Sequence, residues 1–259
     1  METATYEVEA QIEATHWWFV VRRRLLGRMI ATLPLPTDSS VLDIGSSTGT
    51  NLRLLKQVGF SNVQGLDFSE EAVRWCAEKQ LGIVKRGDIC ALPFEDECID
   101  MVLATDIIEH VEDDGLALRE IRRVLRPGGY VLITVPAFEE IWGLQDEVAH
   151  HKRRYRKEML VSRIEDAGLI VGRAFYFNAL LFVPIWLARR LIDLLSIKLN
   201  SEGEVNTPFL NWLFTKIFAF DTWLAPANIF PFGVSILAVV RKQEARPSGI
   251  GSGGEADKQ

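Results

Sequence analysis

The stretch VLDIGSSTGT at residues 41–50 constrains the fold of this chain more than any other segment. An apolar run enters a turn built around Gly45 and Gly49, and leucines at helical spacing follow the turn. This pattern predicts a buried strand, a glycine turn and a helix whose N-terminal amides face a ligand. Strands alternating with helices indicate an α/β protein with a parallel, doubly wound sheet. Further strands are expected at 62–67, 82–88, 98–105, 130–136, 169–177 and 233–242.

The glycine spacing narrows the choice of ligand for this turn. A dinucleotide site needs G-x-G-x-x-G, whereas Gly45 and Gly49 are spaced G-x-x-x-G. Asp43 stands two residues before the first glycine, where it would repel a polyphosphate and attract an ammonium group. The turn therefore favours a ligand that joins a nucleoside to a zwitterionic amino acid, and NAD is the weaker alternative.

Composition excludes some classes of partner. The net charge of −6 argues against a nucleic-acid-binding protein, which needs a broad basic surface. The three cysteines show no C-x-x-C spacing, which fits a reducing compartment. The N-terminal stretch METATYEVEAQIEATHWWF is acidic and lacks the apolar core of a signal peptide. We therefore expect a cytoplasmic protein that binds no nucleic acid.

Five motifs in order resemble the class I S-adenosylmethionine-dependent methyltransferases, in particular the large group with a VLDxGCGTG loop. They are VLDIGSSTGT (41–50), VQGLD (63–67), GDICALPFEDECIDMV (87–102), DIIEHVEDD (106–114) and LRPGGYVLITVP (125–136). The resemblance covers residues 38–177, and the last strand extends it. It implies a Rossmann-like, doubly wound sheet of seven strands, mostly parallel with the last strand antiparallel. It also implies S-adenosyl-L-methionine as the cofactor.

The resemblance assigns residues to the parts of this cofactor. Asp43 and the backbone of the glycine turn hold the methionine end, Asp67 accepts hydrogen bonds from both ribose hydroxyls, and Asp88 takes the adenine amino group. The chain departs from the family at Ser46-Ser47, where Cys-Gly is usual, and a positive φ at Ser47 would cost about 1 kcal/mol. The full predicted cofactor-binding set is Asp43, Gly45, Ser46, Gly49, Asp67, Phe68, Asp88, Ile89 and Asp106.

Ligands of such sheets bind beyond the carboxyl ends of the strands, so the segments after the fourth and fifth strands should border the transferred methyl group. The second of these contains DEVAHHKRRYR (146–156). His150 and His151 are the candidates for a catalytic general base, and Tyr155 for positioning the acceptor. Arg154 and the neighbouring arginines suit a phosphate or carboxylate on the acceptor. The alternative is a solvated approach to a helix, in which these basic residues pair with the acids that precede them.

A metal is a second way to activate an acceptor. Asp106, Glu109 and His110 form D-x-x-E-H. This is similar to the E-x-x-E-H cluster that binds a divalent cation in ubiquinone-pathway O-methyltransferases and small-RNA 2′-O-methyltransferases, and His150 or His151 would complete the site. E-H-V also occurs in methyltransferases without a metal, where it shapes the methionine pocket, so no bound metal is predicted.

The N-terminal stretch HWWFVVRRR (16–24) is also unusual. The family often uses an N-terminal helix as a lid over the cofactor. Trp17 and Trp18 would then pack over the acceptor, with Arg22 facing an anionic group on it. The alternative is an aromatic stripe that faces the core, with a solvated basic face.

A hydrophobic insertion precedes the last strand. About 55 residues intervene where a short connection would suffice, and such length without a function is uncommon. The longest uncharged run, 174–188, is shorter than the roughly 20 apolar residues of a membrane span. A cap over the acceptor, a homodimer interface and a peripheral contact with the inner membrane surface are the alternatives. The expected segments are an N-terminal helical lid (1–37), the cofactor-binding core (38–177), the insertion (178–232), the final core strand (233–243) and a disordered tail (244–259).

Together these features predict a methyltransferase that acts on a small-molecule or lipid-like acceptor, at oxygen. Two alternatives come from other classes. One is an NAD-type oxidoreductase, and the other is a non-catalytic protein of the same fold that docks through its aromatic insertion.

Overall fold

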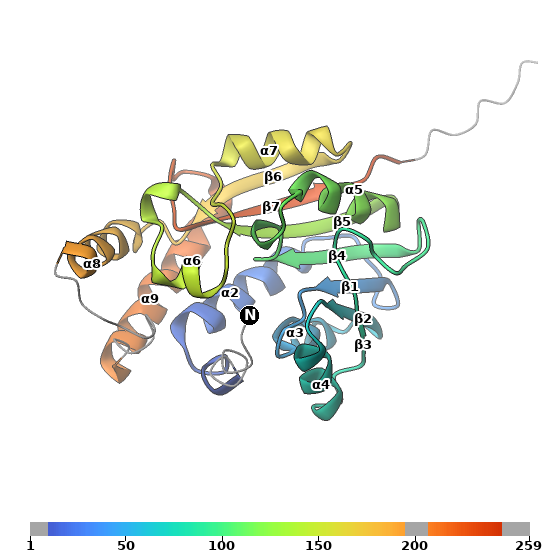
Figure 1. The fold of residues 1–259 in the computed structure, drawn as a ribbon, viewed down its shortest axis with the longest axis horizontal. Coiled ribbons are helices and arrows are strands. Elements are labelled where there is room, and N and C mark those ends of the chain that lie inside the picture. The colour runs from blue at the N-terminus through green and yellow to red at the C-terminus, as the bar shows by residue number, and fades with distance from the viewer. Residues whose placement is uncertain (1–9, 195–206, 245–259) are drawn as a thin grey trace, which may run out of the picture.

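A single sheet of seven strands organises the molecule, in the order β3-β2-β1-β4-β5-β7-β6 (Figure 1). The computed structural model describes residues 10–194 and 207–244. β7 runs antiparallel to both of its neighbours, and the other paired strands are parallel. The predicted sheet, with its antiparallel last strand, is therefore confirmed. The strands are β1 (Ser40–Ile44), β2 (Asn62–Asp67), β3 (Ile83–Arg86), β4 (Ile99–Thr105), β5 (Leu125–Pro136), β6 (Ile170–Phe177) and β7 (Ser235–Arg241).

The direction of winding reverses between β1 and β4. β1 pairs with β2 on one side and with β4 on the other, so the chain adds strands outward in both directions. In a doubly wound sheet this reversal opens a crevice beyond the carboxyl ends of the strands, where ligands bind. The segments that follow β1, β2, β4 and β5 therefore meet at one edge of the sheet.

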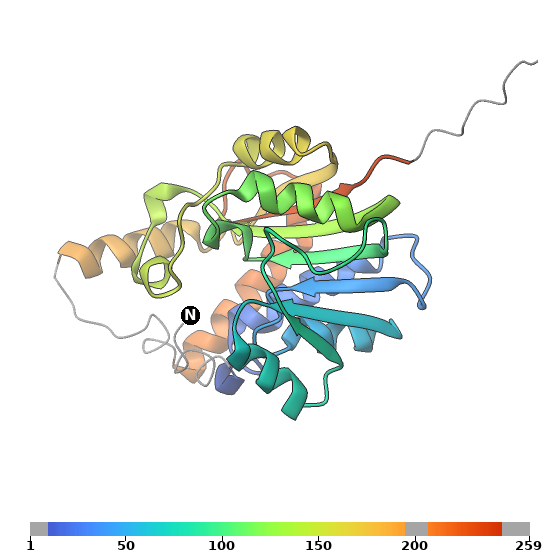
Figure 2. The same ribbon diagram turned by 45° about the vertical axis from the view of Figure 1, so that its right-hand side comes forward.

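Helices cover both faces of the sheet (Figure 2). Side chains of α5 and α7 share one apolar core with the sheet, and those of α2, α3 and α9 share a second core on the opposite face. Every residue of β1 is buried, because both faces of the strand are covered. The helices are α2 (Trp17–Ile30), α3 (Thr50–Val58), α4 (Glu70–Glu78), η1 (Ile108–His110), α5 (Asp114–Val124), η2 (Glu139–Ile141), α6 (Leu144–Val148), α7 (Lys157–Asp166), α8 (Phe182–Leu194), α9 (Pro208–Leu224) and η4 (Ala225–Ala227).

The passage from α5 into β5 differs from the prediction. Asp113 caps α5, because its carboxylate accepts a hydrogen bond from the amide of Leu116 at 2.8 Å. The helix ends at Val124 and β5 starts at the next residue, whereas the sequence pattern predicts a strand only from residue 130. The Pro-Gly-Gly stretch lies inside β5, where the register with β4 shifts, so it forms an irregularity in the strand and not a separate turn.

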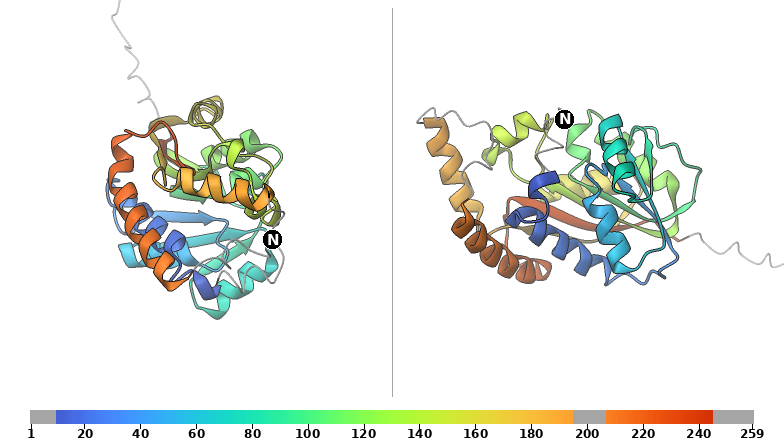
Figure 3. Two further views of the ribbon diagram at one scale, coloured as in Figure 1. Left: turned by 90° about the vertical axis from the view of Figure 1, so that its left-hand side faces the viewer. Right: turned by 90° about the horizontal axis from the view of Figure 1, so that it is seen from below.

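The insertion forms α8 and α9, which lie at one end of the molecule (Figure 3). α9 packs along α2, and the buried carboxylate of Asp221 binds the segment between β6 and α8. That carboxylate accepts hydrogen bonds from the amides of Asn178, Ala179 and Leu180 at 2.6 to 2.9 Å. Within the described residues no helix is long and apolar enough to cross a membrane. Residues 195–206, and the predicted tail from residue 245 on, lie outside the described residues.

Candidate active site

The turn after β1 has the backbone that a close-approaching ligand requires. Gly45 and Gly49 have φ values of 78° and 83°, and Ser47 has a φ of 44°. The predicted positive φ at Ser47 is therefore confirmed, and this serine stands where the family has glycine. A Cβ at Gly49 would lie 2.1 Å from the Leu81 side chain, so the turn has no room for a larger residue there. A Cβ at Gly45 would meet Ile107 at 3.0 Å, which shows that the turn lies against the segment after β4.

Asp43 presents an unsatisfied carboxylate oxygen below this turn. The residue is fully buried, and its Oδ1 accepts a hydrogen bond from Asn51 Nδ2 at 3.0 Å. Its Oδ2 has no hydrogen-bond partner among the described residues. Burial raises the pKa of Asp43 to about 7. A buried carboxylate oxygen without a donor fits an ammonium group, as the methionine end of the proposed cofactor would supply.

The residues predicted to hold the nucleoside follow β2 and β3. Asp67 accepts hydrogen bonds from the amides of Ser47 and Ser69, both at 2.9 Å, so it also braces the glycine turn. Phe68 exposes 71% of its surface, which offers an apolar ring beside that carboxylate. Asp88 is exposed and Ile89 is buried. These placements are compatible with the predicted roles.

Glu13, for which the sequence shows no signal, joins the N-terminal segment to the turn. It is buried, and its carboxylate accepts hydrogen bonds from the hydroxyls of Thr48 and Thr50 and from Arg53. These donors lie at the start of α3, where the helix dipole favours an anion. Glu13 therefore holds the residues before α2 against the glycine turn.

Asp106 and Arg22 form an ion pair with each other. Arg22 Nη2 lies 2.6 Å from Asp106 Oδ2, and it also donates a hydrogen bond to Thr134 Oγ1 at 3.3 Å. Asp106 has a φ of 52°, which is uncommon outside glycine. The predicted contact of Arg22 with an anionic acceptor does not fit this ion pair, in which the arginine is buried. Asp106 thus pairs with Arg22 of α2, and the potential metal-ligand group that the described residues form, Glu109, His110 and His151, does not include it.

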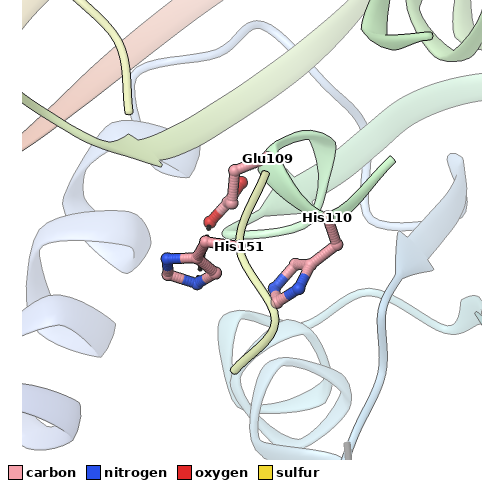
Figure 4. Close-up of side chains that lie close together, drawn as sticks. All are labelled: Glu109, His110 and His151. Carbon is pink, nitrogen blue, oxygen red and sulfur yellow. Dashed lines mark ion pairs between the residues drawn. The ribbon is translucent and has the colours of Figure 1, made fainter. Parts of the chain in front are cut away.

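Glu109, His110 and His151 lie together at the end of β4 (Figure 4). The rings of His110 and His151 are 4.7 Å apart, and His151 Nε2 lies 4.0 Å from Glu109 Oε1. His151 Nδ1 is 2.7 Å from Asp146 Oδ1. Burial raises the pKa of Glu109 and lowers the pKa of His110 to about 4. An imidazole held by a buried carboxylate, with its second nitrogen turned toward polar groups, is suited to proton transfer or metal binding.

The other predicted catalytic residues lie outside this cluster. His150 is exposed, with a φ of 57°, at the turn that ends α6. Tyr155 is fully buried and donates a hydrogen bond to Asp114 at 2.9 Å, so it stabilises the fold and cannot touch an acceptor. Arg154 is buried and binds Asp146 through two nitrogens, at 2.8 and 2.9 Å. The alternative that the basic residues pair with neighbouring acids is confirmed for Arg154, and its predicted grip on the acceptor is corrected.

Trp17 and Trp18 also differ from the prediction that they cover the acceptor. The Trp18 ring stacks on Phe218 at 5.4 Å, and the Trp17 ring packs edge-on against Phe214 and Phe218, both at 5.6 Å. Both tryptophans thus join α2 to α9, in the alternative role of a core-facing stripe. The pattern in the sequence is the same for both roles, and only the position of α9 distinguishes them.

Comparison with known proteins agrees with the fold and the turn. Residues 42–133 match a model of the methyltransferase domain. An uncharacterized 37.1 kDa protein in transposon Tn4556 of Streptomyces fradiae is 37% identical over 236 residues, which cover 85% of this chain and 66% of that protein. The demethylmenaquinone methyltransferase of Staphylococcus aureus is 33% identical over 129 residues, which cover 45% of this chain and 54% of that enzyme. The chain thus matches between about half and two thirds of the length of these relatives.

A solved structure covers nearly the whole chain. It is a chain of the complex between the Trm112 methyltransferase activator of Haloferax volcanii and a proposed methyltransferase, with a TM-score of 0.63 and 22% identity. The likeness covers 94% of this chain and 96% of that chain, and at this identity it concerns the fold alone. The sheet, the glycine turn and the match over residues 42–133 agree, so this part of the chain is a methyltransferase domain with the class I S-adenosylmethionine-dependent fold, and the cofactor of such domains is S-adenosylmethionine.

Proposed function

We propose that the protein transfers a methyl group to an oxygen of a small, lipid-like acceptor. The observation that carries this proposal is the position of the Glu109–His110–His151 cluster. The cluster follows Ile107, whose side chain packs against Gly45 of the cofactor turn. Groups that can remove a proton therefore border the place where the methyl group is presented.

Each residue of the proposed site has a separate task. Bound S-adenosylmethionine supplies an electrophilic methyl group. Asp43 holds the ammonium group and Asp67 the ribose, and together they orient the methyl group toward the acceptor. His151, held at Nδ1 by Asp146, accepts the hydroxyl proton of the acceptor at Nε2. The name of the Staphylococcus aureus relative supports a small-molecule acceptor.

Calorimetric titration tests this function. We expect S-adenosylmethionine and its demethylated product to bind at one site, and NADH not to bind, because Asp43 repels a polyphosphate. A labelled methyl group should then pass to an extractable lipid-like compound from cell extract. Binding of NADH in place of S-adenosylmethionine would indicate an oxidoreductase, and binding of neither would indicate a scaffold.

We further propose that α9 contacts a lipid surface through an aromatic stripe, defined as Phe209, Trp212, Lys216, Phe220 and Trp223. These side chains are exposed and recur at helical spacing, so they share one face of α9. The opposite face packs on α2. Exposed tryptophan and phenylalanine are typical of helices that lie in a membrane interface.

The charge of the stripe favours a lipid surface over a second copy of the chain. The charged residues of α9 are Lys216, which is exposed, and Asp221, which is buried. The stripe is therefore cationic on a protein whose net charge is −6. A lysine among exposed aromatic rings attracts anionic headgroups, whereas two copies of the stripe would bring two lysines together.

Vesicle flotation tests this contact. The purified protein should float with vesicles that contain phosphatidylglycerol and far less with vesicles of phosphatidylcholine alone. Replacing Trp212 and Trp223 by serine should reduce the floating fraction about tenfold or more, since two buried rings are lost. Ile83→Ser, which removes an exposed apolar side chain at the far edge of the sheet, is the matched control. A dimer in solution that the tryptophan variant abolishes, with no flotation, would contradict the proposal.

A further inference from the structure

We propose that Glu109, His110 and His151 bind a divalent transition-metal ion. One potential ligand atom of each residue lies within 4.8 Å of the others. Ligands of an ion with bonds of about 2.1 Å lie roughly 3 to 4.2 Å apart, so small side-chain rotations bring these atoms to bonding distance. This set differs from the one suggested by D-x-x-E-H in the sequence, because Asp106 pairs with Arg22 and His151 takes its place.

Glu109 is the strongest indication of a site that binds a cation. Its side chain is fully buried, and neither carboxylate oxygen has a hydrogen-bond partner among the described residues. The buried arginines on either side are paired with other acids, Arg22 with Asp106 and Arg154 with Asp146. A buried carboxylate without a donor is costly unless it is paired or coordinates a metal.

His151 is oriented as metal-ligating histidines commonly are, and His110 lies against it. The Nδ1 of His151 faces the buried carboxylate of Asp146 at 2.7 Å, which leaves Nε2 directed toward Glu109. The His110 ring lies beside the His151 ring, and the two ring centroids are 4.7 Å apart. An outer partner such as Asp146 fixes the tautomer and the direction of a ligating imidazole. Both rings lie beside the carboxylate of Glu109 (Figure 4).

The types of ligand select the class of ion. Two imidazoles and one carboxylate suit Zn²⁺, Fe²⁺, Co²⁺ or Mn²⁺, whereas Mg²⁺ and Ca²⁺ prefer oxygen ligands throughout. Three protein ligands leave coordination positions open for water or a substrate atom. If the proposed methyl transfer holds, an acceptor hydroxyl would bind at such a position and lose its proton more easily. In that case His151 is a ligand, and the metal takes over the activation of the acceptor.

Titration of the full chain with Co²⁺ tests the site directly. Protein dialysed against a chelator should bind one Co²⁺ and develop the visible absorption of a site with nitrogen and oxygen ligands. Glu109→Gln keeps the shape of the side chain and removes its charge, and should weaken binding at least about 100-fold. Asp146→Asn should weaken binding about 10- to 100-fold, because it removes the partner that orients His151.

Neighbouring histidines provide the control. His151→Ala should abolish the absorption, and His150→Ala, one residue away and exposed, should leave the affinity within about twofold. Circular dichroism of each variant reports whether it folds. Absence of Co²⁺ binding in the wild-type protein, or equal loss in both histidine variants, would overturn the proposal. Because Co²⁺ binding is measured without S-adenosylmethionine, its failure leaves the proposed methyl transfer untouched, and failure of methyl transfer leaves the metal site standing.

Discussion

Replacement of Asp43 by asparagine is expected to stabilise the protein while weakening its binding of S-adenosylmethionine. The pKa of Asp43 is raised from its ordinary value of 3.8 to about 7 in the folded protein. Between these pH values the folded protein keeps a proton that the unfolded chain has lost, so the free energy of unfolding falls as the pH rises through this window. The free-energy cost of burying the ionised carboxylate is fully present above about pH 7, and asparagine, which carries no charge, lacks this cost.

The size of the stabilisation is limited by the new amide. Removing the charge recovers about 4 kcal/mol at high pH, and a buried amide without an acceptor costs about 1 to 3 kcal/mol. Denaturant unfolding should therefore show a gain of about 2 kcal/mol near pH 8, which turns into a loss of about 2 kcal/mol near pH 4, where only the cost of the amide remains. A variant less stable than the wild type at pH 8 would contradict the raised pKa.

Cofactor binding should change in the opposite direction. Loss of a charged hydrogen bond to the ammonium group is expected to weaken S-adenosylmethionine binding at least about tenfold above pH 7. The wild-type affinity should also decline as the pH falls below about 7, whereas the variant should lack this dependence. Methylthioadenosine, which has no amino-acid group, is the matched control and should bind both proteins equally. Equal weakening of both ligands would show that Asp43 supports the turn and does not contact the ammonium group.

Alanine at position 151 is expected to reduce methyl transfer by about 10²- to 10⁴-fold, the range typical of a lost general base. His151 Nδ1 lies 2.7 Å from the buried carboxylate of Asp146, which holds the ring toward Glu109. The loss should appear in turnover and leave the affinity for S-adenosylmethionine within about twofold, because the cofactor residues follow other strands.

His150→Ala is the paired experiment for this prediction. The residue has the same side chain, lies next in the chain and is exposed, so its turnover should stay close to that of the wild type. Equal turnover in both histidine variants would exclude His151 from catalysis. Assay after exhaustive chelation then separates two roles, because a free base keeps working without a metal and a metal ligand does not.

The strand ends and the turn that carry the predicted cofactor-binding residues were largely predictable from the sequence. These residues lie at fixed distances in sequence from the strand ends. Their positions depend on the local strand-turn-helix unit and not on the packing of distant segments. The same holds for the positive φ at Ser47, which follows from the geometry of the turn. Glu13 is the exception, since an isolated acid in an N-terminal segment carries no pattern that predicts its contact with Thr48 and Thr50.

The acceptor half was less predictable, because its chemistry depends on pairings between distant segments. His150 and His151 are equal candidates in the sequence. In the structure their side chains point in different directions, so that His150 is exposed and His151 lies toward Glu109. Arg22 and Arg154 are residues of a type that commonly binds anions. In the fold each of them instead forms an ion pair with an aspartate. Charged side chains pair with whichever opposite charge packing brings near, and composition does not contain that information.

The sequence by itself determined the order of strands and helices, the glycine turn and the acids that follow the first strands, because hydrophobic period and short-range spacing are local properties. Only the tertiary structure decided which side chains form the reactive cluster. Glu109 and His151 lie on segments that meet because β4 and β5 are neighbours in the sheet. The same is true of Trp18 and Phe218, whose stacking depends on the position of α9 against α2. Contacts between residues far apart in the chain arise from the packing of whole elements, which no local pattern specifies.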